Sequence, residues 1–248
     1  MPRLDNMNIL CVIPARGKSK RVTNKNIWTL QGKPLISHTI ENALESKLCD
    51  KVVVSTDDQK IAEIAGYYEI DAIKRPANLA LDTSAVDDAL RHAVKHLEKK
   101  QGFFTDIVVF LQANVPIRKK GEIDKVIAKL KSIKDATSVV TVYAADQRPE
   151  WMKKIDPKTD RIIPFMKPTN LYRKQDLPEL YLLDGAITAV KRKVLMDTEG
   201  FRKIHAFLGE RVYPVIHDRK YSIEIDELED IELAEYFLLK EKGYKVSL

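Results

Sequence analysis

Cysteine is scarce in this sequence, which has only Cys11 and Cys49 among its 248 residues. Two thiols cannot form the disulfide framework of a small secreted domain, and both lie among apolar neighbours, so we expect reduced thiols in a cytoplasmic protein. No apolar run approaches the roughly 18 residues that span a bilayer. The first residues also lack the apolar core of a signal peptide. These absences exclude a disulfide scaffold and predict no membrane segment.

Glycine is also rare, at nine residues, and the loop that follows the first predicted strand has only one. Residues 14–26 contain five basic side chains, no acid and the single glycine Gly17. They match neither the Walker loop nor the G-x-G-x-x-G turn, which hold phosphates with backbone N–H groups. Such a loop must hold an anion through its side chains, as Arg and Lys can do for phosphate. A solvated basic turn is the alternative, although like charges this dense repel each other in an empty loop.

Acidic residues gather near the other end of the sequence, where residues 222–235 contain seven acids and no base. A nucleic-acid binder usually carries a broad basic stripe with interleaved aromatic residues, and this pattern is absent despite the net charge of +6. We expect a compact anionic ligand and a metal site instead. Glu224 and Asp226 belong to this acidic cluster. Asp226 alone is equally explained as a cap of the following helix.

Strands and helices alternate along most of the chain. Short apolar runs predict strands at 8–13, 51–55, 106–111, 137–142, 185–190 and 211–216. Apolar spacing predicts a helix over 122–131, a capping box predicts another from Ser84 through Leu97, and a last helix is expected from about Leu228 to Lys242. Asp57 and Asp58 are also interpreted as caps. The alternation predicts a single α/β domain, 1–248, with a mostly parallel Rossmann-like sheet covered by helices on both faces.

This regularity breaks after about Ala145. Five of the eleven prolines fall between there and Tyr181, and no long helical period survives. Trp151, Phe165 and Tyr172 favour a segment that packs over a disordered linker. We therefore predict that residues 145–181 form an inserted lid or dimerisation arm that contains a short hairpin.

Several motifs together carry a family resemblance. Residues 13–21 are Ile-Pro-Ala-Arg-Gly-Lys-Ser-Lys-Arg and are followed by Asn24-Lys25-Asn26. Later motifs are Val54–Asp58, Arg75-Pro76, Leu111-Gln112, Pro116-Ile117-Arg118, Arg173–Pro178, Gly185-Ala186 and Ser222–Asp226. In this order, and over most of the chain, they resemble the acylneuraminate cytidylyltransferases, which make CMP-activated sialic acids and related nonulosonates.

The resemblance implies in-line attack on the α-phosphate of CTP by the anomeric hydroxyl of a carboxylated 2-keto-3-deoxy sugar, with release of pyrophosphate. It predicts Arg16, Lys20, Lys25 and Asn26 as catalytic residues that hold the phosphates. The predicted nucleotide contacts are Ala15, Arg16, Lys25, Asn26, Arg75 and Asp82. The predicted sugar contacts are Gln112, Arg173 and Gln175, with Arg173 on the carboxylate. The resemblance also places Glu224 and Asp226 at a strand end, as alternate residues that can face one ion, and predicts them as the ligands of the cofactor Mg²⁺. No role is predicted for any histidine, because none shows metal-ligand spacing.

The chain departs from the family pattern at four places. Asn114-Val115 replace a usual Thr-Ser, Asp184 replaces a frequent Asn before Gly-Ala, and Thr188 stands where a tyrosine is common. Asp184 and Thr188 lie where the sugar would sit, so the resemblance leaves the acceptor open. Glu224 replaces a commoner aspartate, which lengthens the side chain but keeps the carboxylate.

Three hypotheses follow for the function. The first is a nonulosonate cytidylyltransferase acting as a homodimer, in which the 145–181 arm contributes to the partner's site. The second is a 3-deoxy-manno-octulosonate cytidylyltransferase or another sugar nucleotidyltransferase. The octulosonate enzymes usually have a Leu-Pro-Lys-Pro run where this chain has Asn24-Lys25-Asn26, and other sugar nucleotidyltransferases usually have a glycine-rich first loop. The third is a non-catalytic binder of nucleotide or RNA, which predicts no metal dependence.

Overall fold

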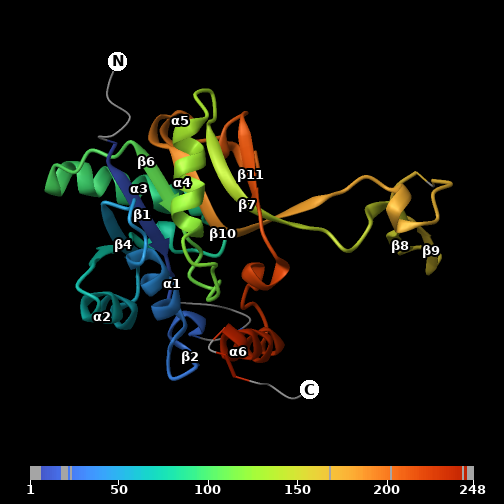
Figure 1. Cartoon of the computed structure of the whole chain (residues 1–248), viewed down its shortest axis with the longest axis horizontal. Helices are drawn as coiled ribbons and strands as arrows, with labels where there is room; N and C mark the ends of the chain where they lie inside the picture. The colour runs from blue at the N-terminus through green and yellow to red at the C-terminus, as the bar shows by residue number, and fades with distance from the viewer. Residues whose placement is uncertain are drawn as a thin grey trace.

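Seven strands form the central sheet within residues 7–17, 22, 24–167, 169–201, 203–241 and 243–244, the part of the chain that this computed structural model describes (Figure 1). The strands are β1 (Ile9–Pro14), β4 (Lys51–Thr56), β5 (Asp71–Lys74), β6 (Ile107–Phe110), β7 (Ser138–Ala144), β10 (Tyr181–Lys191) and β11 (Val212–Ile216). Their order across the sheet is β11-β7-β10-β6-β1-β4-β5. β1 is parallel to β4 and β6, β4 to β5, and β7 to β11. The predicted mostly parallel α/β sheet is confirmed.

Strand β10 is the exception, because it runs antiparallel to both β6 and β7. The connection explains this direction. A parallel neighbour requires a crossover, usually a helix, whereas an antiparallel strand can return from the end at which the previous strand left. The chain leaves β7 at Ala144 and returns at Tyr181 through the arm, with no α-helix in the described residues between them. β10 also carries a register shift between Leu183 and Thr188.

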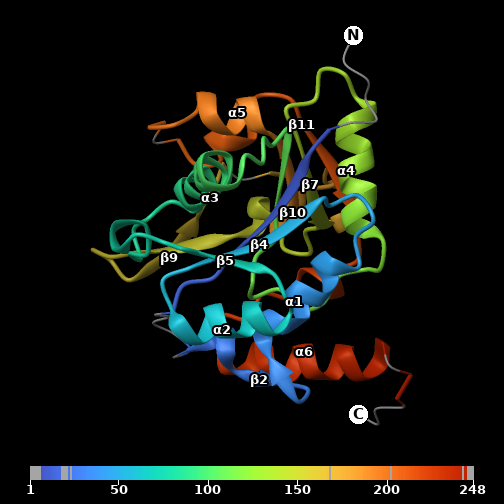
Figure 2. The same cartoon turned by 90° about the vertical axis from the view of Figure 1, so that its left-hand side faces the viewer.

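Helices cover both faces of the sheet, as predicted (Figure 2). Alternate side chains of β1 explain the arrangement, because Cys11 and Ile13 belong to one buried cluster and Leu10 and Val12 to another. The first cluster includes residues of helices α1 (Leu35–Leu44), α2 (Gln59–Tyr67) and α4 (Glu122–Ser132). The second includes residues of α3 (Val86–Gln101) and α5 (Arg192–Asp197).

A third buried cluster joins the two ends of the sequence. Helix α6 (Leu228–Glu241) contributes Ala234 to it, and the segment before this helix contributes Ile223 and Ile225. Leu30 enters the same cluster from the small hairpin of β2 (Thr29–Leu30) and β3 (Lys33–Pro34). The acid-bearing segment is thereby packed next to the region that follows the basic loop.

The arm projects away from the sheet (Figure 1) and carries the predicted hairpin, in which β8 (Lys153–Asp156) pairs with β9 (Arg161–Pro164). Its apolar side chains are largely exposed, with Ile155 at 64%, Ile162 at 72% and Phe165 at 59% of full accessibility. Its role in dimerisation stays a prediction.

The helix boundaries confirm most of the predicted ends. Helix α4 begins at Glu122 as expected, and α6 begins at Leu228 and ends at Glu241, next to Lys242, which lies outside the described residues. The capping box at Ser84 is wrong, because α3 begins at Val86 and the Ser84 hydroxyl donates to the carbonyl oxygen of Asn78 at 2.9 Å. None of the described helices is both long and apolar enough to cross a bilayer.

Candidate functional site

A cavity of about 330 Å³ opens at the carboxyl ends of β1 and β6 and beside the start of α3. This is where open α/β sheets bind their ligands. Side chains predicted to bind nucleotide or sugar line it together, namely Arg16, Lys25, Asn26, Arg75, Asp82 and Gln112. Residues from five separate parts of the sequence therefore meet in one place.

Arg16 and Asn26 are held together at this cavity. The amide nitrogen of the buried Asn26 side chain donates to the carbonyl oxygen of Arg16 at 2.9 Å. The Arg16 guanidinium forms an ion pair with Asp82 and remains about one-third exposed. The cation therefore lies at the cavity wall with part of its surface accessible to an anionic ligand.

The basic loop leaves β1 against the end of β4. The Gly17 N–H donates to Asp57 Oδ1 at 3.0 Å. A Cβ added to Gly17 would lie 2.5 Å from Asp58 Oδ2, so the close approach requires the loop's single glycine. Asp58 caps α2 as predicted, accepting from the N–H groups of Lys60 and Ile61, whereas Asp57 holds the loop.

Lys18, Lys20 and Arg21 lie outside the described residues. The catalytic role assigned to Lys20 on the resemblance therefore stays a prediction.

Lys25 joins the basic loop to the acidic segment. Its Nζ lies 2.8 Å from Oδ1 of Asp226, a residue 201 positions later in the sequence. The two side chains are only 14% and 33% exposed. The start of α6 is instead served by Asp230, whose carboxylate accepts from the N–H groups of Asp226 and Glu227, both at 2.8 Å. Asp226 therefore contacts Lys25, a residue that lines the cavity, although neither Asp226 nor Glu224 lines it.

Glu224 carries the clearest electrostatic signature of the segment. Burial and the neighbouring negative charge of Asp226 raise the pKa of Glu224 to about 7. Residues 223–226 are not in a strand, contrary to the prediction, but their burial still alternates, with Ile223 and Ile225 buried. Because this alternation keeps Glu224 and Asp226 off the buried face, the local geometry that the prediction needed is retained.

The donor set for a metal ion is small. Among the described residues, no three His, Cys, Asp or Glu side chains gather into a group that could hold a metal by themselves. Two neighbouring carboxylates, one with a raised pKa, suit a divalent cation that takes its other ligands from water and phosphate.

Ala15 and Arg75 are fixed by one residue at the end of β4. The Ala15 N–H donates to the carbonyl oxygen of Ser55 at 2.9 Å. The buried Arg75 donates to the same carbonyl oxygen at 2.6 Å and to the Ser55 hydroxyl at 3.2 Å. Both residues therefore belong to the rigid frame of the cavity, and Arg75 also lines it.

Gln112 depends on a glycine in β10. Gly185 has a φ of +64°, and a Cβ there would lie 1.9 Å from Gln112 Nε2. Only glycine adopts this conformation readily and leaves this space. The Gly-Ala motif thus allows the Gln112 side chain to pass over the backbone of β10 at the cavity.

The structure does not bring Arg173 and Gln175 to this cavity. Both lie in the arm, Gln175 within a short 3-10 helix (Lys174–Asp176). The exposed Arg173 pairs with Asp176 at 2.7 Å. Within one chain, the predicted carboxylate-binding arginine is therefore separate from the nucleotide-side residues.

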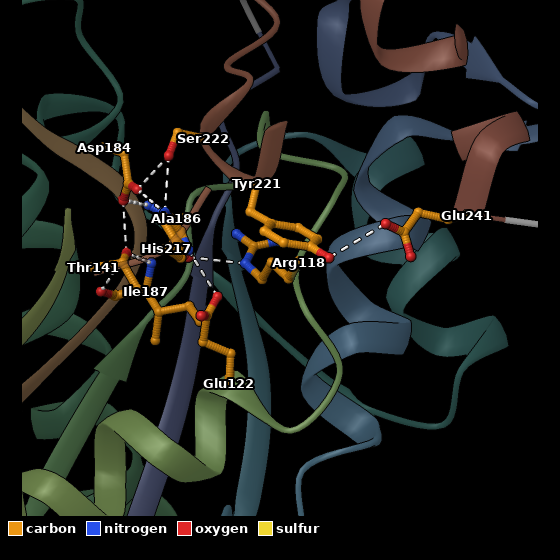
Figure 3. A network of polar contacts seen from close by, with 10 residues as sticks. All are labelled: Arg118, Glu122, Thr141, Asp184, Ala186, Ile187, His217, Tyr221, Ser222 and Glu241. Carbon is orange, nitrogen blue, oxygen red and sulfur yellow. Dashed lines mark hydrogen bonds and ion pairs between the residues drawn. The ribbon is translucent and has the colours of Figure 1, made fainter. Parts of the chain in front are cut away.

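A buried network that was not predicted from the sequence is centred on His217, the residue after β11 (Figure 3). His217 Nδ1 lies 2.8 Å from Glu122 Oε2, and Nε2 contacts Asp184 and lies 2.9 Å from the Ser222 hydroxyl. Burial alone would lower the pKa of His217, but the bonds to Asp184 and Glu122 outweigh it and raise the pKa to about 9. No sequence spacing points to this network, because Glu122 and His217 are 95 residues apart.

Arg118 is a second buried cation beside the network. Its guanidinium donates to the carbonyl oxygens of Gln112, Val115 and Ala186 at 2.5–2.9 Å. Burial lowers the pKa of Arg118 to about 10, and the nearby Asp184 and Glu122 favour its charged form. Arg118 therefore ties the end of β6 to the bulge of β10.

The mostly parallel sheet and the cation-lined cavity at its carboxyl edge are the features of an α/β nucleotide-binding protein. The chain belongs to the cytidylyltransferase family, whose model, described as "Cytidylyltransferase", matches residues 10–242.

Named relatives agree with this assignment. The chain is 34% identical to a CMP-N,N'-diacetyllegionaminic acid synthase of Legionella pneumophila, over 92% of this chain and 95% of that protein. It is 30% identical to a pseudaminic acid cytidylyltransferase of Campylobacter jejuni, over 92% of this chain and 95% of that protein. It is also 30% identical to an N-acylneuraminate cytidylyltransferase of Streptococcus agalactiae, of which it spans only 57%.

A solved structure shares the fold at low sequence identity. A CMP:2-keto-3-deoxy-manno-octonic acid synthetase complexed with CTP matches 94% of this chain with a TM-score of 0.69 at 20% identity. This likeness supports the α/β nucleotidyltransferase-like fold.

Proposed function

We propose that this protein transfers CMP from CTP to the anomeric hydroxyl of a nonulosonic, sialic-acid-like sugar. The anomeric oxygen forms a bond to the α-phosphorus, the bond from that phosphorus to the bridging oxygen breaks, and pyrophosphate and a proton are released. The observation that carries the proposal is the meeting of the basic loop with the acidic segment through Lys25 and Asp226. The family match and relatives named for three nonulosonates support the substrate class.

The chain's own residues supply binding and orientation for this reaction. Arg16 and Lys25 offset the charge of the triphosphate, and Asn26 donates near the α-phosphate. Preorganised charges of this kind account for most of the catalysis in phosphoryl and nucleotidyl transfer. Asn26 is already buried and bonded to Arg16, so its orientation is set before the nucleotide binds.

Glu224 and Asp226 are the residues that would hold Mg²⁺. When bound, this ion would offset negative charge on the phosphates. The raised pKa of Glu224 supports this assignment, since a cation would relieve the repulsion between the two carboxylates. Lys25 pairs with Asp226 and also lines the cavity in which the phosphates would lie.

The sugar is expected against Gln112, at the β10 side of the cavity. Arg173 can reach such a cavity only from another copy of the chain, if the arm crosses to a partner. The exposed Ile155, Ile162 and Phe165 suit a homodimer in which the arm docks on the second copy. We therefore propose a homodimer in which each arm completes the partner's acceptor site.

Mixing two inactive variants tests this arrangement. Arg173→Ala and Lys25→Ala would each be inactive alone, but a mixed dimer would contain one cavity with Lys25 that receives an intact arm. Recovery of activity on mixing and subunit exchange supports the arm's role in the partner site. Absence of recovery, with mixed dimers confirmed by native mass spectrometry, contradicts it.

The reaction itself is tested by incubating the protein and Mg²⁺ with each of the four nucleoside triphosphates and a panel of sugar acids. We expect pyrophosphate and a CMP-sugar of the correct mass only with CTP and a nonulosonic acid. Turnover of 3-deoxy-manno-octulosonate instead would favour the second hypothesis. One solved protein with the same fold is a synthetase named for that sugar. Nucleotide binding that needs neither metal nor Asp226, without turnover, would favour the non-catalytic binder.

A further inference from the structure

The carboxylate of Asp184 is bonded to four residues, from β7, from its own strand β10 and from the segment after β11 (Figure 3). Its Oδ1 accepts from the Thr141 hydroxyl of β7 at 2.6 Å and from the Ala186 N–H of β10 at 2.9 Å. Its Oδ2 accepts from the Ser222 hydroxyl at 2.6 Å and contacts His217 after β11. The side chain is fully buried, and each oxygen already has two partners. Asp184 is therefore occupied within the protein and does not present a free oxygen to a ligand.

The network holds the acidic segment at its first residue. Ser222 lies two residues before Glu224, and its hydroxyl binds Asp184 and lies 2.9 Å from His217 Nε2. Three residues later, the Ile225 N–H donates to the carbonyl oxygen of Asn114, a cavity residue, at 2.8 Å. The stretch 222–226 is thus fixed at both ends, and Asp226 then reaches Lys25.

The same network touches the sugar side of the cavity. Asp184 directly precedes Gly185, the glycine over which Gln112 passes. Arg118 donates to Ala186 on this bulge and to the carbonyl oxygen of Gln112. A displacement of Asp184 would therefore shift both the acidic segment and the part of β10 that contacts Gln112.

Charge explains why a histidine stands between the two acids. Asp184, Glu122 and His217 have side chains that are 0%, 3% and 2% exposed. Two buried carboxylates require partners, because a buried charge left unpaired is strongly unfavourable. A protonated His217 and the nearby Arg118 balance the two negative charges, and the imidazole bonds one acid through each nitrogen.

We propose that His217 is a positioning residue that, through Asp184 and Ser222, sets where residues 222–226 lie relative to Lys25 and Asn114. The proposal rests on the proposed function for its effect on turnover, but its structural part stands without it. Groups that orient metal-binding side chains in other proteins typically change activity or metal affinity by about 10–100-fold when mutated.

Two variants separate positioning from general stability. His217→Gln removes the charge between the acids, whereas Ser222→Ala leaves the buried charges intact and breaks only their link to the segment. We expect both to speed amide hydrogen exchange of Ile225 by about tenfold or more relative to the β1 amides, as local opening does. We also expect kcat to fall by about 10–100-fold while KM for CTP stays close to the wild-type value. His96→Gln, in helix α3 and outside the network, is the matched control.

A double-mutant cycle provides the second readout. Asp184→Asn alone sets an amide against the imidazole, and His217→Gln alone removes the imidazolium between the two acids and leaves Arg118 as the nearby cation. Combined, two neutral amides can bond each other, so the double variant should be more active than the product of the single effects predicts.

The positioning role of His217 can be tested even if His217→Gln does not fold, because Ser222→Ala then carries the test. Wild-type Ile225 exchange and kcat in folded Ser222→Ala would overturn the proposal. If the wild-type protein releases no pyrophosphate from CTP, the proposed function fails. The exchange measurement still decides whether the network positions the segment.

Discussion

The cavity and the arm use their charged residues in opposite ways. At the cavity, Lys25, Arg75 and Asp226 are partly or fully buried and bonded within the fold. In the arm, Arg173 and Lys174 have side chains that are 69% and 52% exposed and pair with neighbours that are also accessible. Exposed pairs contribute little stability, whereas buried ones hold fixed positions at a desolvation cost. The charged residues of the cavity are thus held within one chain, whereas those of the arm lie open at its surface.

The largest expected effect is at Asp226. Asp226→Asn should reduce Mg²⁺-dependent turnover below detection, because it removes a carboxylate from Lys25 and from the proposed metal site. Both side chains of the ion pair keep some exposure, so its loss should change Tm by only a few degrees. Steady-state kinetics and thermal melting check this, with Glu232→Gln on the exposed side of α6 as the control. A collapse of the fold would show that Asp226 acts mainly in the start of the helix.

Arg16 should give the next largest effect. Arg16→Ala is expected to lower kcat/KM for CTP by about 10²–10³, the usual cost of losing one preorganised charge contact. Lys60→Ala, which removes an exposed cation from α2, should leave kcat/KM unchanged. Full activity of Arg16→Ala would show that its pairing with Asp82 is its whole role and would contradict the phosphate assignment.

The cavity side was predictable from sequence because its signals are local. The strand before the basic loop and the Asp58 cap each depend on residues that lie close together in the sequence, and the structure places both as expected. The direction of β10 and the His217–Glu122 contact were not predictable, because they depend on which distant segments meet. The prediction that Ser84 caps a helix is wrong for a related reason, since its hydroxyl donates to the carbonyl oxygen of Asn78 and not to the helix end.

Substitutions in the arm should change how the chains assemble, whereas substitutions at the cavity should change the rate of the reaction. Ile155→Ser combined with Ile162→Ser replaces two exposed apolar side chains of the hairpin and is expected to shift a dimer towards monomer. The Tm of the monomer should change little, because neither residue belongs to the core. Light scattering over a concentration series measures the shift. A dimer of unchanged affinity would show that the arm does not form the interface.

Gly185 tests whether the cavity has separate nucleotide and sugar sides. Gly185→Ala would place a Cβ against Gln112 and cost about 1–2 kcal/mol of backbone strain at positive φ. We expect KM for the sugar acid to rise clearly more than KM for CTP. Ala186→Gly, one residue along, provides a backbone control without a clash. An equal rise in both KM values would mean that Gln112 does not divide the two sides as proposed.

The smallest expected effect is on the pH dependence of the free energy of unfolding, to which the buried pairs of His217 should contribute and an exposed arm pair should not. The pKa of His217 is raised from 6.5 to about 9, so its contribution is fully present below pH 6.5 and is lost as pH rises through 9. The free energy of unfolding should therefore fall over this window by on the order of 1–3 kcal/mol more in wild type than in His217→Gln. Lys174→Gln, which removes an exposed arm pair, should keep the wild-type slope. Urea unfolding at pH 6.5 and 9 measures the difference, and parallel slopes for wild type and His217→Gln would show that His217 is not a charged partner of Asp184 and Glu122.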